Sequence, residues 1–142
     1  MIRLLLAALV LTLSFAATAD GPGPCADGRS PSLDRFAAPI RSPADLAAWL
    51  AGRRPEASDP LIALSPPARA RFLASLRFGA QGLASFQSED IQSELSASQA
   101  WRLLALFGLQ SSLAAMPPLA VRSSEDAEVE AWRRMVALTE AP

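Results

Sequence analysis

The 142-residue chain contains no histidine, no lysine, no tyrosine and no asparagine, and only one cysteine. Without histidine it can form no Ser-His-Asp triad, no Cys-His pair and no histidine general base. A zinc site built from Cys and His ligands is excluded for the same reason. Without lysine it can form no Schiff base and no phosphate-binding lysine loop. We therefore expect no cofactor and no metal, and carboxylates are left as the groups for acid–base chemistry.

Charge of either sign is also scarce. The chain has 13 arginines and 14 acidic residues, which gives a formal net charge of −1. A chain without a basic excess has no electrostatic footprint for DNA or RNA, so we expect no nucleic-acid partner. Half of the residues are hydrophobic (51%), which is enough for one modest core.

The beginning of the chain has the pattern of a secretory signal. Arg3 is the only charge before Asp20, residues 4–17 are almost entirely apolar, and small residues stand at 17 and 19. The apolar run of about 14 residues is shorter than the roughly 20 that span a bilayer. We predict a signal peptide over residues 1–19 and an exported protein, periplasmic or extracellular, with no membrane contact after cleavage.

The composition is Ala- and Arg-rich and free of Lys, which is typical of a GC-rich bacterial genome. Cys25 has no second cysteine in the chain with which to form a disulfide. It is left to pair with another chain, to stay free, or to have no role. The residues before it, Pro22 to Pro24, do not match a lipoprotein signal.

Two segments follow the predicted signal. Residues 20–41 are rich in Pro and Gly and show no periodic apolar pattern, so we expect an extended arm whose anchors to the domain are Leu33, Phe36 and Ile40. Residues 42–140 show repeated helix starts and form the predicted single helical domain. The predicted helices begin near Ser42, Ser65, Ser88, Ser96 and Ser123.

The segment at about 97–114 differs from the other predicted helices. Its leucines and Phe107 point all round a helical cylinder, and Arg102 is its only charge. A helix that is apolar on every side is a buried one, so we expect this segment to be the central element. Strand signals are absent from residues 42–140, since this part of the chain has no alternating run and no Asn-Gly or Asp-Gly turn. The predicted fold class is all-α: a small orthogonal or bundle-like domain of four to five helices around the central helix.

The last predicted helix begins with acidic residues and continues with basic ones, which favours the helix dipole. We expect Glu130 and Arg134 to pair at i, i+4. The expected inward face of this helix consists of Val129, Trp132, Met135 and Val136.

Acidic residues cluster at two helix starts. Glu89, Asp90 and Glu94 form one group, and Asp126 and Glu130 repeat the i, i+4 spacing. Paired carboxylates can act as acid and base in glycoside cleavage, or bind Ca²⁺. We interpret both groups as solvated helix starts and assign no catalytic, cofactor-binding or metal-binding residue.

The segment 78–90 combines aromatic side chains with uncharged polar neighbours, a composition found at protein interfaces. The candidate partner-contact surface consists of Phe78, Gln81, Leu83, Phe86 and Gln87. Together these features predict an exported helical protein that acts by binding another protein of unknown identity, as inhibitors and immunity-type proteins do. The alternatives are a small carboxylate-dependent hydrolase acting on envelope glycan and a structural or degenerate exported protein.

Overall fold

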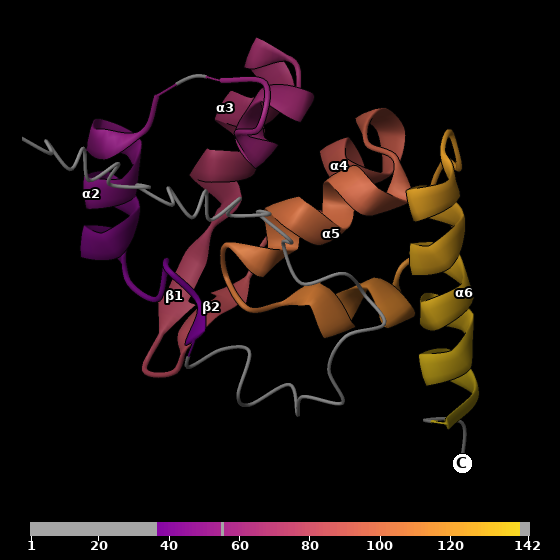
Figure 1. Cartoon of the computed structure of the whole chain (residues 1–142). Helices are drawn as coiled ribbons and strands as arrows, with labels where there is room; N and C mark the ends of the chain where they lie inside the picture. Colours follow the sequence, from indigo (N-terminus) through magenta and orange to yellow (C-terminus); the bar gives the residue numbers. More distant parts are fainter. Residues whose placement is uncertain (1–36, 55, 140–142) are drawn as a thin grey trace, which may run out of the picture.

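The computed structural model describes residues 37–54 and 56–139, and this part of the chain is mostly helical (Figure 1). The predicted signal peptide, Cys25 and most of the predicted arm lie outside the described residues. Within the described residues, five α-helices, two 3-10 helices and one antiparallel hairpin follow each other. They are α2 (Pro43–Gly52), η1 (Pro60–Ala63), α3 (Pro66–Ser75), β1 (Arg77–Gly79), β2 (Gly82–Ser85), α4 (Glu89–Glu94), α5 (Ala97–Ala105), η2 (Gln110–Ala115) and α6 (Ser124–Thr139).

Serine caps set the predicted helix starts. The Ser42 hydroxyl accepts the Asp45 N–H at 3.1 Å, and the Ser65 hydroxyl accepts the Ala68 N–H at 3.4 Å. A proline follows each of these two serines, at a position where the missing N–H has no helical acceptor. The start of α5 carries the capping box of Ser96 and Gln99. The starts of α2, α3 and α5 are therefore confirmed.

The expectation of a chain without strands is wrong, because residues 77–85 form a short antiparallel hairpin. Phe78 pairs with Leu83 and Gly79 pairs with Gly82, with a register irregularity between Arg77 and Phe78. Gly82 has a φ of +110°, a conformation that suits the glycine following a tight turn. The strands are only three and four residues long, too short to show an alternating pattern.

The predicted central helix is shorter than expected, because the chain leaves the helical path after Ala105. Gly108 has a φ of +68°, its N–H donates to the Ala105 carbonyl, and the Leu109 N–H donates to the Leu104 carbonyl. These two bonds form the glycine-dependent helix end known as the Schellman motif. The second half of the predicted helix is the 3-10 helix η2, and the apolar residues after 105 reach the core from a turn.

The core surrounds α5, which contacts η1, η2 and α6. Phe72 of α3 lies at its centre, fully buried and edge-to-face with Phe86 and Phe107 at centroid distances of 6.0 and 6.2 Å. Ile40 is also fully buried, and its N–H donates to the Leu106 carbonyl at 3.0 Å. The packed unit therefore includes residues that precede the first predicted helix. In Figure 1, α6 (yellow) forms one edge of the molecule and the hairpin lies toward the other.

Gly108→Ala tests the helix end. A side chain in the left-handed region costs about 1–2 kcal/mol, so we expect the free energy of unfolding to fall by that amount in urea titrations. Gly52→Ala is the matched control, because a Cβ at Gly52 meets nothing within 4 Å and the φ of this residue is not positive. A Gly108→Ala protein as stable as the Gly52→Ala protein would contradict the assigned helix end.

Candidate functional site

The five residues of the predicted contact surface lie in and beside the hairpin, but they do not form one exposed face. Leu83 is 2% exposed and belongs to the core. Phe78 and Phe86 are half-buried against the core, whereas Gln81 at the turn and Gln87 are exposed. The Gln87 N–H donates to the Ser75 hydroxyl at 3.0 Å, which fixes the end of the hairpin on α3. The exposed part of this surface therefore consists of two glutamines and the partly exposed side chains of two phenylalanines.

Two carboxylates of the first acidic cluster join α4 to α3. Glu94 accepts both the Ser65 N–H at 2.7 Å and the Ser65 hydroxyl at 2.8 Å. The Asp90 carboxylate accepts hydrogen bonds from two nitrogens of the Arg71 guanidinium, Nη2 at 2.5 Å and Nε at 3.2 Å. Glu89 is exposed and makes no side-chain contact of this kind within the described residues. The interpretation of this cluster as a solvated helix start therefore holds for Glu89 alone.

The second acidic pair is buried, which sequence analysis missed. Asp126 is 1% exposed and accepts two backbone N–H groups, from Ser98 and Arg122, each at 2.8 Å. The Ser98 N–H belongs to the first turn of α5, so this carboxylate lies at the positive end of the helix dipole of α5. The Asp126 N–H itself donates to the Ser123 hydroxyl at 3.1 Å. One carboxylate therefore fixes the starts of α5 and α6 relative to each other.

Glu130 and Arg133 form the second half of this arrangement. Glu130 accepts the Leu119 N–H at 3.0 Å with one oxygen and the Arg133 Nε at 2.9 Å with the other. Arg133 also donates to the Met116 carbonyl at 3.1 Å. The exposed fractions of Glu130 and Arg133 are only 6% and 9%. The pair therefore holds the segment 116–122, which connects η2 to α6, against the inner face of α6.

Val129 is buried as predicted, but the inward face of α6 otherwise differs from the predicted one. It consists of Asp126, Val129, Glu130 and Arg133. Met135, expected inside, is 58% exposed. Trp132 is half-buried and edge-to-face with Trp101 at 4.6 Å. The predicted Glu130–Arg134 pair is replaced, since Glu130 binds Arg133 and the Arg134 Nε donates to the Glu130 carbonyl.

The surroundings of Asp126 shift its acidity. Burial by itself raises the pKa of Asp126, but hydrogen bonds from the Ser98 hydroxyl and N–H, the Ser96 hydroxyl and the Arg122 N–H outweigh it and hold the pKa far below its usual range. In an unfolded chain the pKa of an aspartate is about 3.9. Asp126 therefore stabilises the fold fully above that pH, and this contribution is lost as the pH falls toward the lower pKa of the folded protein.

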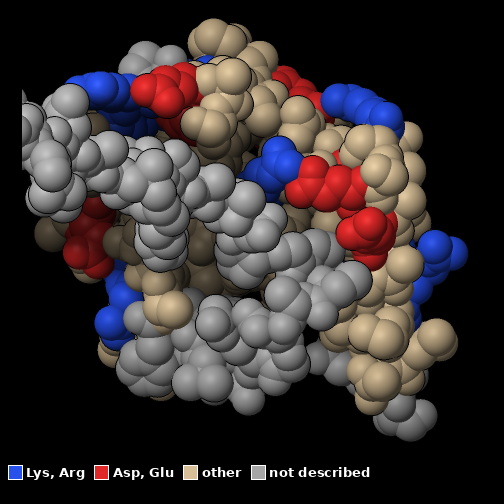
Figure 2. Space-filling model, in the orientation of Figure 1, with Lys and Arg blue, Asp and Glu red and all other residues tan. Residues whose placement is uncertain are grey.

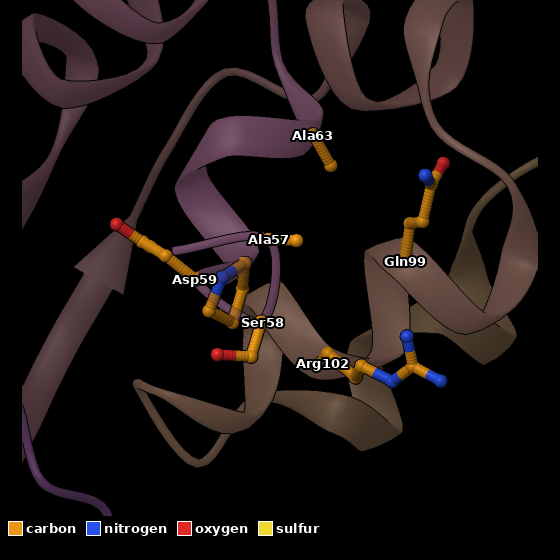
Figure 3. Close-up of a pocket in the computed structure, with 7 residues that line it drawn as sticks. Ala57, Ser58, Asp59, Ala63, Gln99 and Arg102 are labelled. Carbon is orange, nitrogen blue, oxygen red and sulfur yellow. The ribbon is translucent and has the colours of Figure 1, made fainter. Parts of the chain in front are cut away.

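Figure 3 shows a hollow between the segment 57–63 and α5, with about 300 Å³ of space that includes open solvent. Its charged side chains and Gln99 already have partners within the protein. Asp59 binds Arg53 at 2.7 Å, Gln99 accepts the Ser96 N–H at 2.9 Å, and Arg102 pairs with Glu125. These partners leave the hollow without free charged groups that converge on a ligand. On the face in Figure 2, acidic and basic residues lie beside one another instead of forming a patch of one sign.

Within residues 37–54 and 56–139, no three Asp, Glu, Cys or His side chains come together in a group that could hold a metal ion. None of the helices described there is both long and apolar enough to cross a membrane.

Asp126→Asn removes the charge and keeps the shape of the side chain. We expect it to lower the free energy of unfolding by about 2 kcal/mol at neutral pH, because buried N–H groups lose a charged acceptor. The difference from the unmodified protein should shrink below about pH 4, where the wild-type carboxylate also begins to lose its stabilising effect. Urea titrations from neutral to acid pH measure both effects. Glu128→Gln, an exposed change on the same helix, should have little effect at any pH, and an equal loss in both variants would contradict this role of Asp126.

Glu94→Ala and Glu89→Ala distinguish a structural carboxylate from a solvated one on the same helix. Loss of Glu94 leaves the start of α3 without two hydrogen bonds, so we expect a loss of about 1–2 kcal/mol in the free energy of unfolding. Glu89→Ala should stay within about 0.5 kcal/mol of the wild type. Equal stability of the two variants in urea would show that the Glu94–Ser65 contact does not support the fold.

Comparison of this chain with protein-family models, with curated proteins and with solved structures found no match.

Proposed function

We propose that this chain is an exported helical protein that acts by binding another protein, in the manner of an inhibitor or an immunity-type protein. The main support for the proposal is that four of the chain's carboxylates are engaged in hydrogen bonds within the protein. Asp90, Glu94, Asp126 and Glu130 bind backbone N–H groups, a serine hydroxyl or arginines. Carboxylates held in this way are poor candidates for the acid and base of a hydrolase, whose groups must face a substrate.

The hairpin offers the contact surface in this proposal. Gln81 and Gln87 are exposed, and Phe78 and Phe86 are half-buried and pack against the core. A ring that packs partly against the core gives apolar contact area at a low cost in side-chain entropy. Figure 1 shows the hairpin turn at the margin of the molecule, away from α6.

Site-specific photo-crosslinking tests this surface. A photo-reactive amino acid at Gln81 should give one defined crosslinked product in the cells that make the protein, and Phe78→Ala should reduce its yield at least several-fold. Gln92 provides the matched control, because it is an exposed glutamine on α4, outside the hairpin. A reactive group at Gln92 should not give that product.

Two different results would contradict this proposal. Identical crosslinks from Gln81 and Gln92, or no product from either, would count against binding through the hairpin. Turnover of an envelope glycan by the purified protein, abolished by Glu89→Gln and by Glu94→Gln, would replace the proposal with the hydrolase alternative.

A further inference from the structure

The outer face of α6 carries apolar side chains that no other described element covers. Met135 is 58% exposed and Leu138 is 78% exposed, and Ala131 is exposed one turn before Met135. Positions 131, 135 and 138 follow the spacing of one helix face, opposite the buried Val129 and Arg133. On the face shown in Figure 2, the described residues at the end of α6, at the lower right, are neither acidic nor basic.

Charges of opposite sign flank the middle of this face. Glu128, Ala131 and Arg134 follow each other at i, i+3, i+6 and are all exposed. Glu128 makes no ion pair within the described residues, and the Arg134 Nε donates only to the Glu130 carbonyl of its own helix. The three residues form a row with an acid at one end, a base at the other and a small residue between them.

A row of this kind is complementary to itself. When a second copy is turned by a two-fold axis through Ala131, perpendicular to the row, Glu128 of each chain lies opposite Arg134 of the other. An i±3 row is inclined about 45° to its helix axis, so two such rows packed together make the helices cross nearly at right angles. Alanine at the crossing point allows the two backbones to approach closely.

We propose that the outer face of α6 binds a second copy of this chain in a two-fold symmetric contact centred on Ala131. Two Glu128–Arg134 pairs fix the crossing, and Met135, one turn from the crossing point, supplies apolar contact. A stable interface buries about 800 Å² on each partner, more than a single helix crossing provides, so the dimer is weak and depends on concentration. The contact is independent of the proposed binding through the hairpin, because the hairpin and α6 lie apart in the molecule (Figure 1).

Sedimentation equilibrium of the protein, produced from its full-length gene and purified from the producing cells, tests this dimer. Measured up to about 1 mM, the mean mass should rise from that of one chain to that of two. Glu128→Arg and Arg134→Glu should each raise the dissociation constant about tenfold or more, because each change places two pairs of like charges opposite one another. The double variant Glu128→Arg, Arg134→Glu should restore the dimer, which loss of folding could not do. Glu89→Arg on α4 should change nothing.

A protein that stays monomeric at every concentration would overturn the proposal. So would a dimer that is insensitive to both single charge reversals, or one that the double variant fails to restore. These outcomes leave the crosslinking result at Gln81 unaffected, so the failure of either surface can be recognised by itself.

Discussion

The carboxylate of Asp126 connects the two helices on which the architecture depends. Buried to 1% exposure, it accepts N–H groups from the first turn of α5 and from the segment that leads into α6. The Ser98 N–H would otherwise lie in the interior without an acceptor, at a cost of about 1–3 kcal/mol. The position of α6 on α5 follows from this contact, and Glu130 with Arg133 extends it to the segment 116–122. A small domain without disulfides thus gains a fixed geometry from charge that is fully hydrogen-bonded.

The hydrogen bonding of the acidic side chains also bears on function. The chain has few ionisable side-chain types, and several of its acids are committed to backbone N–H groups or arginines in the interior and between helices. The surface of the described residues also carries the half-buried side chains of Phe78 and Phe86 and the apolar side chains on the outer face of α6. Surfaces of this composition suit contact with other proteins more than chemistry on a bound substrate.

Local signals predicted the helical class and most helix starts, because a serine followed by proline, or spaced three residues from Gln99, acts within a single turn. The hairpin could not be predicted from local sequence patterns, since its short strands are specified by the burial of Leu83 and the turn at Gly82. The end of α5 did carry a signal, because Gly108 interrupts an otherwise continuous apolar run. Reading that glycine as a helix end would have divided the predicted central helix correctly.

The candidate site was harder to predict than the fold. Asp126, Val129, Glu130 and Arg133 share the i, i+3, i+4, i+7 spacing of a buried face, but three of them are charged, and charged residues are rarely buried unless paired. Their burial depends on acceptors and donors supplied by residues from 98 to 122, and no local pattern contains that information. The same long-range dependence placed Met135 at the surface instead of in the core.

Native-state amide hydrogen exchange tests this account most directly. If Asp126 and Glu130 hold α5, α6 and the segment between them together, the amides of Ser98, Leu119 and Arg122 should exchange slowly and with a common free energy of opening. That value should lie close to the free energy of global unfolding. Fast exchange at Leu119 and Arg122, independent of exchange at Ser98, would contradict it, because the connecting segment would then open without separating the helices.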